Sequence, residues 1–164
     1  MASLKWCCRQ KDGIKFIEPN DNLARGYLKM AEDSLGTMNR ERNKSIRWAI
    51  SSCYYSMYYS LYSVFMKIGI KCEIHSCTLE FMKIFLNDFY SKEDMKIIKM
   101  AFDSRNIVQY YVDGIVSTED SEHIMKNAPL FFNKSREILA KINEKSVKEI
   151  KEKFKSIYEM DLSK

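Results

Sequence analysis

The chain has 164 residues, of which 27 are Lys or Arg and 22 are Asp or Glu, so its formal net charge is +5. This length is sufficient for one compact domain with a hydrophobic core, and the low counts of five Gly and two Pro argue against a loop-rich or all-β protein. The positive charge fits a nucleic acid or another acidic partner, but a lysine-rich surface also serves solubility alone.

The first 18 residues contain two short strand-like runs separated by Lys11-Asp12-Gly13. Asp-Gly between two such runs is a hairpin signal, so the sequence predicts a small β-hairpin over residues 4–18. Polar residues around Asn20 then offer an N-cap for a helix over residues 23–38. The apolar residues spaced for one buried stripe on this helix are Leu23, Tyr27, Met30, Ala31 and Leu35.

Residues 47–68 form the stretch around which the other elements are expected to pack. The segment has no Pro or Gly, and as a helix it would be apolar nearly all round, which is typical of a buried helix. Five tyrosines and five serines interrupt it, so it lacks the run of about 18 apolar residues that a membrane-spanning helix needs. We therefore expect the central helix of a soluble bundle and no membrane partner.

Two further helices are expected after Gly69. His75 and Ser76 can cap the first of them, which carries its apolar side chains over residues 79–86. Residues 91–94 read Ser-Lys-Glu-Asp and have the form of a capping box, which opens a fourth helix that runs to about Val112.

A fifth helix is expected to begin at Ser117, and Pro129 is expected to kink or restart it. The side chains expected to face inward on it are Leu130, Phe131, Ile138, Leu139 and Ile142. The tail continues an apolar stripe among Lys and Glu, with Val147, Ile150, Phe154 and Ile157. Such a stripe packs more often on its own bundle or on a twin subunit than on a membrane.

These elements predict an all-α fold, an up-and-down bundle of four or five helices with a short N-terminal β-hairpin. We expect a single helical domain over residues 1–164, divided into the hairpin (1–18), the helical bundle (19–143) and a C-terminal amphipathic helix (144–164).

The cysteines and histidines give little indication of a metal site. The five cysteines are an odd number without the spacing of a disulfide framework, so we expect reduced thiols and a cytoplasmic protein. Cys72, His75 and Cys77 lie close together, but their irregular spacing is a weak zinc signal, and a helix cap with two half-buried thiols is the favoured interpretation. We predict no metal and no cofactor. The only other histidine is His123, and no Ser, His and Asp triad is recognisable.

A polar cluster stands at the end of the fourth helix. Arg105 and Gln109 lie one helical turn apart, and Asn106, Tyr110 and Asp113 form a second row beside them. A cation, two amides, a phenol and a carboxylate on neighbouring faces can form a functional site. The alternative is structural: Arg105 pairs with an acid, and the tyrosines pack inward with their hydroxyls satisfied.

The chain resembles the HEPN domains of bacteria and archaea, which are often encoded beside a minimal nucleotidyltransferase. Residues 27–35 are similar to the first family helix and residues 49–59 to the second, while residues 74–76 and 105–113 complete the match. The N-terminal Trp6-Cys7 and Gly13-Ile14-Lys15 resemble an archaeal branch of the family.

The resemblance implies a bundle whose ribonuclease members carry an Arg, usually followed by a polar residue, and a His after four to six intervening positions. Arg105 and Asn106 match the first half of this motif, but Tyr110, Tyr111 and Val112 stand where the His is expected. A Tyr, with an ordinary pKa of about 10, is a poor general base beside a His. Whether the chain is a metal-independent ribonuclease therefore stays open, with Arg105, Asn106 and Tyr110 as the candidate catalytic residues.

The resemblance also implies partners. Two copies of the chain would bring their Arg105 residues to one groove, where Arg105, Gln109, Tyr110 and Tyr111 bind RNA, such as tRNA or mRNA, or a nucleotide. The nucleotidyltransferase would modify Tyr110 or Tyr111 and silence the protein. Three hypotheses follow: the HEPN component of a toxin–antitoxin-like pair with a degenerate site, a non-catalytic nucleotide- or substrate-binding partner of the nucleotidyltransferase, and a structural helical dimer.

Overall fold

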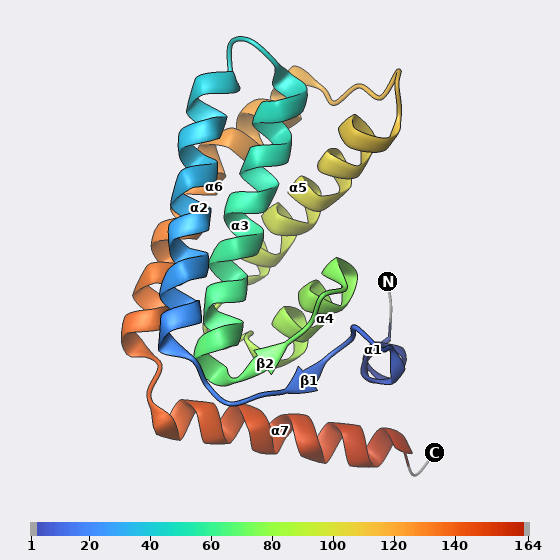
Figure 1. The fold of residues 1–164 in the computed structure, drawn as a ribbon. Coiled ribbons are helices and arrows are strands. Elements are labelled where there is room, and N and C mark those ends of the chain that lie inside the picture. Colours follow the sequence, from blue (N-terminus) through green and yellow to red (C-terminus); the bar gives the residue numbers. More distant parts are fainter. Residues whose placement is uncertain (1–2, 163–164) are drawn as a thin grey trace.

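The computed structural model describes the backbone of residues 3–162 and the side chains up to residue 157. Four long helices lie side by side: α2 (Asp21–Glu41), α3 (Ile46–Ile68), α5 (Lys92–Tyr110) and α6 (Thr118–Lys141). The short helices α1 (Leu4–Arg9) and α4 (His75–Phe85) lie near the lower end of this bundle, and α7 (Glu144–Leu162) crosses beneath it (Figure 1). The predicted all-α helical bundle is confirmed.

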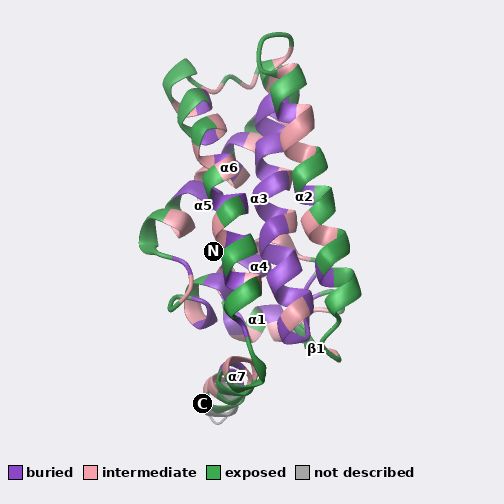
Figure 2. Cartoon of the chain, turned by 90° about the vertical axis from the view of Figure 1, so that its left-hand side faces the viewer, coloured by how far each residue is buried: buried purple, intermediate pink, exposed green. Residues whose placement is uncertain are grey.

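The helix α3 is the centre of the bundle, as the sequence predicts. Its side chains are buried over nearly its whole length, and Figure 2 shows it as the most continuously buried element. The small buried residues Ser56, Ser60 and Ser63 let neighbouring helices approach closely, and the Ser60 hydroxyl donates back to the Ser56 carbonyl at 2.7 Å. Trp48 is an exception, because 59% of its surface is exposed. Gly69 ends the helix in the left-handed conformation, with φ of 76°.

The helix α2 begins and ends slightly outside the predicted range. Its cap is the predicted one, since the Asn20 side chain accepts a hydrogen bond from the backbone N–H of Leu23 at 2.9 Å. The predicted buried stripe is wrong for Leu23 and Met30, which are exposed. Ala31 is buried as predicted, and the other buried side chains are Ala24 and Met38, because the face against α3 is turned toward these positions.

The predicted N-terminal hairpin is wrong. Residues 4–9 form α1, in which Leu4 and Cys7 share one buried face and the Ser3 hydroxyl caps the first turn. The Asp12-Gly13 turn exists, but it leads from α1 into the strand β1 (Lys15–Phe16). This strand pairs antiparallel with β2 (Ile70–Lys71), which follows α3. The Asp12-Gly13 turn is compatible with a strand on either side of it, but it does not determine which strand pairs with β1. In the structure the partner of β1 is the distant strand β2, not the segment before the turn.

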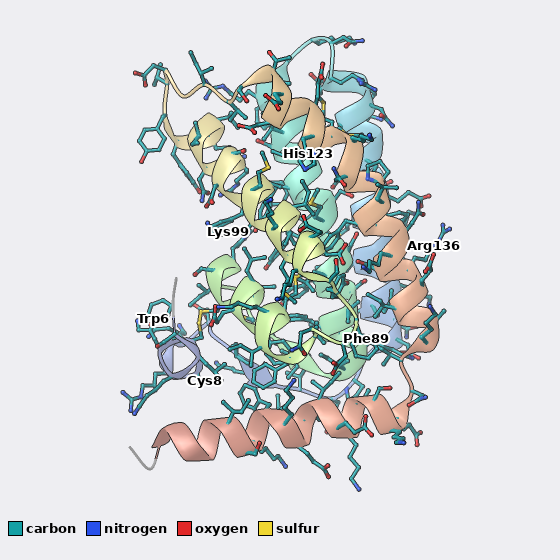
Figure 3. The ribbon with its side chains drawn as sticks, turned by 180° about the vertical axis from the view of Figure 1, so that it is seen from behind. Trp6, Cys8, Phe89, Lys99, His123 and Arg136 are labelled. Carbon is teal, nitrogen blue, oxygen red and sulfur yellow. A yellow bond between two sulfur atoms is a disulfide. The ribbon has the colours of Figure 1, made fainter. Side chains whose placement is uncertain are left out.

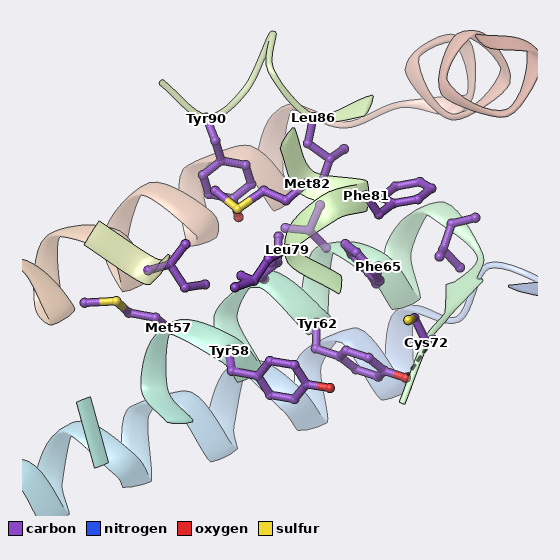
Figure 4. Packing of buried hydrophobic residues seen from close by; sticks show 14 of the residues in the cluster. Met57, Tyr58, Tyr62, Phe65, Cys72, Leu79, Phe81, Met82, Leu86 and Tyr90 are labelled. Atoms are coloured by element: carbon purple, nitrogen blue, oxygen red, sulfur yellow. Dashed lines mark hydrogen bonds between the residues drawn. The ribbon is translucent and has the colours of Figure 1, made fainter. Parts of the chain in front are cut away.

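The remaining helices follow the predictions with two exceptions. The capping box of α5 is present, with Ser91 and Asp94 exchanging hydrogen bonds. Pro129 lies inside α6, which continues as one helix through it, and Leu130 is exposed rather than facing inward. Figure 4 shows how aromatic side chains of α3 and α4 fill the core, where the hydroxyl of Tyr62 accepts a hydrogen bond from the backbone N–H of Cys72.

The helix α7 packs its apolar stripe against its own chain. Ile150 and Phe154 are buried, and the Phe154 ring lies 4.8 Å from that of Phe16, 5.3 Å from Phe85 and 6.0 Å from Phe81. Among the described residues, no helix is long and apolar enough to cross a membrane.

The expectation that all five thiols are reduced is wrong for one pair. Cys7 of α1 and Cys77 of α4 form a disulfide that joins positions 70 residues apart. Figure 3 shows this bond between the two helices, near Trp6 and Cys8. The disulfide fixes α1 to the start of α4, a pairing that the sequence spacing does not reveal.

Candidate functional site

The end of α5 is held against the start of α3 by Arg47. The Arg47 guanidinium donates to the backbone oxygen of Val108, to that of Tyr111 at 3.2 Å and to that of Val112 at 3.1 Å. The last carbonyls of a helix have no partner within it, so a side chain of α3 caps α5. Arg47 thereby fixes where the last turn of α5, which carries Tyr110, lies relative to α3.

Arg105 makes three side-chain hydrogen bonds at this end of the bundle. Its Nη2 donates to the hydroxyl of Tyr55 at 2.7 Å, while its Nη1 donates to Asn106 Oδ1 at 2.9 Å and to the hydroxyl of Tyr110 at 3.3 Å. These bonds use three of the five N–H donors of a guanidinium. Its Nε is buried and has no hydrogen-bond partner among the described residues.

Three tyrosine rings surround the Arg105 guanidinium. Its central carbon lies 5.3 Å from the ring of Tyr110, 5.4 Å from that of Tyr55 and 5.8 Å from that of Tyr54. These distances are within the range of a cation–π attraction. No carboxylate pairs with Arg105 among the described residues, so its charge is held by neutral groups and stays available to an anion.

The structure brings together some of the predicted site residues. Arg105, Asn106 and Tyr110 are in contact, as the helical spacing suggests. Gln109 and Tyr111 make no side-chain hydrogen bond in the described part of the chain, although Tyr111 is exposed beside them. The structural alternative predicts that Arg105 pairs with an acid. This is wrong, because Arg105 is held by the hydroxyls of two tyrosines and by the amide oxygen of Asn106.

His75 is a residue of this region that the sequence interpretation missed. The expected capping role is wrong, because Ile74 is the N-cap residue of α4 and makes no side-chain cap bond. The imidazole instead turns to α3, where its Nδ1 shares a hydrogen bond of 2.5 Å with the hydroxyl of Tyr54. Its ring stacks on Tyr58 at a centroid distance of 4.2 Å and an angle of 6°.

Arg105 and His75 contact the same two tyrosines. The His75 ring lies 5.6 Å from the Tyr54 ring and 6.4 Å from the Tyr55 ring, and the guanidinium lies over both. An imidazole and a guanidinium from different helices therefore flank one pair of adjacent phenols on α3.

The surroundings favour the neutral form of both partners in the Tyr54–His75 hydrogen bond. Burial lowers the pKa of His75, and the positive charge of Arg105 lowers it further. Burial also raises the pKa of Tyr54 above its ordinary value. The Tyr54 hydroxyl thus stays protonated, and it can donate to Nδ1 of His75 or accept from it, depending on the tautomer.

A tyrosine track, defined as Tyr55, Tyr59 and Tyr27, leads away from Arg105. The rings of Tyr55 and Tyr59 stack at 5.7 Å, and those of Tyr59 and Tyr27 lie 6.1 Å apart. The track borders a cavity of about 410 Å³ that is lined by Tyr27, Tyr58, Tyr59 and Tyr62, with Ile17, Leu23, Met66, Lys71 and Glu73 around them. The volume is that of a small-molecule site, and the lining suits a planar ring.

An exposed apolar patch lies at the same end of the bundle. It consists of Ile46 and Trp48 at the start of α3 and of Ile107, Tyr110, Tyr111, Val112 and Ile115 at the end of α5 and beyond. The contacts of Arg47 hold these two segments together. Exposed apolar side chains gathered at one end of a molecule commonly mark an interaction surface.

The Cys72, His75 and Cys77 trio is not assembled as a metal site. Cys77 is bonded to Cys7, and Nδ1 of His75 is engaged by Tyr54. Within the described residues, no group of three His, Cys, Asp or Glu side chains is arranged to hold a metal ion.

Comparison with known families gives one result. A family model described as the HEPN domain matches residues 24–139, which is more than half of the chain. The match begins in α2, ends in α6 and includes Arg105, His75 and the tyrosine track. No curated protein matches the chain.

Proposed function

The chain belongs to the HEPN domain family, and from this premise we propose that it binds single-stranded RNA at the Arg105 site. Membership supports a ribonuclease-like or nucleotide-binding role. The finer proposal is that the chain is the HEPN component of a toxin–antitoxin-like pair with a minimal nucleotidyltransferase.

The observation that carries this proposal is the preorganised, unneutralised guanidinium of Arg105. Three hydrogen bonds fix its plane, and they leave one Nη2 hydrogen without a partner among the described residues. A fixed planar fork binds the oxygens of a phosphate with little loss of side-chain entropy. RNA supplies a phosphate at every step, so the site matches its backbone.

The tyrosine track supplies the second element that single-stranded RNA needs. Bases that are not paired stack on aromatic side chains, and such stacking is worth about 1–3 kcal/mol per base. Tyr55, Tyr59 and Tyr27 are partly exposed and follow one another along α3 and α2. An RNA strand with one phosphate at Arg105 can reach the tyrosine track along the surface, because these three rings are partly exposed.

A homodimer is part of the proposal, with the apolar patch as its interface. Trp48 exposes 59% of its surface and Val112 exposes 96%, next to the Arg105 site. Covering this patch with a second copy would bury it and bring two Arg105 sites to one groove, as the family resemblance implies.

Modification by the nucleotidyltransferase has a physical rationale at Tyr110. Its hydroxyl is 3.3 Å from Nη1 of Arg105, and 68% of the residue is exposed. A nucleotide attached to this hydroxyl would place its phosphate beside the guanidinium and occupy the RNA site. Tyr111, which is also exposed, is the second candidate. Mass spectrometry after co-expression tests this: an unmodified pair of tyrosines would refute this part of the proposal.

The proposed RNA binding is tested with a labelled mixed tRNA pool at low salt, by comparing the native chain with Arg105→Ala. The affinity is expected to fall about 10- to 100-fold, as for the loss of one or two charge-assisted hydrogen bonds. Arg136→Ala is the matched control, because it removes the same charge from the exposed face of α6 (Figure 3). Equal losses in both variants would show that Arg105 acts only as a general charge and would overturn the site.

The cavity beside the tyrosine track supports one alternative function: the chain is a non-catalytic, nucleotide-binding partner of the nucleotidyltransferase. In that case free nucleotides bind the chain in competition with RNA, and Tyr59→Ala weakens both. Toxicity on expression in cells separates the hypotheses: if Arg105→Ala abolishes it, the toxin hypothesis is supported over the binding partner. A chain that binds neither ligand and only dimerises would leave the structural hypothesis.

A further inference from the structure

We propose that His75 supplies the acid–base group that is missing from the motif on α5, so that the RNA site of this chain cleaves as well as binds. The inference rests on the proposed RNA binding. Its basis is the placement of the imidazole and the guanidinium over Tyr54 and Tyr55, described above.

His75 is held in one orientation by its neighbours on α3. Its ring is stacked on Tyr58 at 4.2 Å and its Nδ1 is bonded to the Tyr54 hydroxyl, so both its plane and its rotation are fixed. A second hydrogen-bond partner that orients the imidazole is what a catalytic His requires. With Nδ1 engaged, Nε2 is the atom left to exchange a proton with a ligand.

His75 and Arg105 are chemically complementary. Cleavage of RNA by its own 2′-hydroxyl needs a group that takes the hydroxyl proton and a cation beside the phosphate. The motif residues Arg105 and Asn106 offer only the second of these. Tyr110 contributes a phenol, which is a poor base at neutral pH. The imidazole of His75, at the start of α4, supplies the first of these groups, so no further residue of α5 is needed.

The step balances within the substrate and water. Nε2 of His75 takes the proton of the 2′-hydroxyl as the 2′-oxygen attacks the adjacent phosphorus. The bond from phosphorus to the 5′-oxygen breaks, and the leaving 5′-oxygen takes a proton from water. The hydroxide that remains takes the proton held on Nε2, which restores water and the neutral imidazole. The products are a 2′,3′-cyclic phosphate and a 5′-hydroxyl, while Arg105 stabilises the charge on the non-bridging phosphate oxygens.

The groups that face the imidazole favour a free base at neutral pH. On α3 these are the hydroxyls of Tyr54, Tyr55 and Tyr58, and on α5 the cation is Arg105. No carboxylate among the described residues pairs with His75. Burial and the cation both lower the pKa of His75, so the basic form persists to a pH below the ordinary value.

The experiment measures binding and cleavage separately on the full-length protein, with a labelled tRNA pool and single-stranded homopolymers. The variants are His75→Gln, which keeps a polar partner for Tyr54, and His75→Phe, which keeps the ring stacked on Tyr58. Both are expected to bind RNA within about two-fold of the native chain and to cleave about 10²- to 10⁴-fold more slowly. The native products should carry 2′,3′-cyclic phosphate ends. The native rate should hold through the ordinary pKa of an imidazole and fall only at a lower pH, because the pKa of His75 is lowered by burial and by Arg105.

Each outcome decides one point. Native cleavage that persists in either folded variant would overturn the role of His75. RNA binding without any cleavage by the native chain would also overturn it, but would leave the proposed RNA site intact. Loss of binding by the native chain itself would instead refute the proposed function. Circular dichroism of the two variants establishes which of them is folded, and one folded variant is sufficient for the comparison.

Discussion

Replacement of Phe154 by Ala tests whether α7 belongs to its own bundle. Phe154 is 5% exposed, and its ring lies within 4.8–6.0 Å of the rings of Phe16, Phe81 and Phe85. Replacing a buried Phe by Ala costs about 3–5 kcal/mol. Phe16 is 40% exposed and can move into the space, so the lower end, about 3 kcal/mol, is expected. With an m-value of about 2 kcal/mol per molar urea, the unfolding midpoint should fall by about 1.5 M.

The assay is urea unfolding followed by circular dichroism, with Lys155→Ala as the matched control in the same helix. Lys155 is exposed, so its replacement should change the free energy of unfolding by less than about 0.5 kcal/mol. The measurement is repeated at two protein concentrations. Equal midpoints for the two variants would refute the packing of α7 on its own chain. A midpoint that depends on protein concentration only in the native chain would assign the stripe to a twin subunit.

Three other predictions concern the disulfide, the turn after α1 and His75. Cys7→Ser opens a loop of 70 residues, so the free energy of unfolding should fall by about 4 kcal/mol from loop-closure entropy, and reductant should lower the native chain to the same value. Gly13→Ala places a Cβ 1.7 Å from the Cys7 carbonyl oxygen, so it should lower the melting temperature. Gly26 lies in the helix α2, where an added Cβ would have no atom within 4 Å, so Gly26→Ala should raise the free energy of unfolding by about 0.5–1 kcal/mol. The pKa of His75 in the folded state lies below its unfolded value of about 6.5, so between these two pKa values the unfolded state binds more protons than the folded state. The free energy of unfolding should therefore fall as the pH drops through this range. The fall should be smaller in His75→Gln than in the control His123→Gln.

The sequence predicts the helices well because their signals are local. The capping box at Ser91, the cap at Asn20 and the apolar run of α3 all act within a few residues, and each is present in the structure. The N-terminal strand was mispaired because the turn at Asp12-Gly13 does not specify which strand follows it. Its partner, β2, lies beyond two long helices, and only the folded bundle brings it near.

In the candidate site, too, contacts within one helix could be predicted from the sequence, and contacts between helices could not. Arg105, Asn106 and Tyr110 lie on one helix, so their proximity follows from 3.6 residues per turn. Tyr55 and Arg105 are 50 positions apart and Tyr54 and His75 are 21 apart, and no periodicity within one element relates such pairs. They meet only because the fold brings α5 and the start of α4 against the same part of α3.

The absence of a His from the motif on α5 is therefore a weak argument that the chemistry was lost. A general base has to be near the 2′-hydroxyl in space, and its position along the chain is irrelevant to proton transfer. An imidazole can approach Arg105 from α5 itself, through the positions of Tyr110 to Val112, and also from α4, through its first residue. His75 occupies the second of these positions with its ring orientation fixed. Tyr110 then becomes free for a different use, since its hydroxyl only supports Arg105 and its exposed ring is open to bases or to modification. On this argument Tyr110→His should add little to cleavage by the native chain but should restore part of it in His75→Gln.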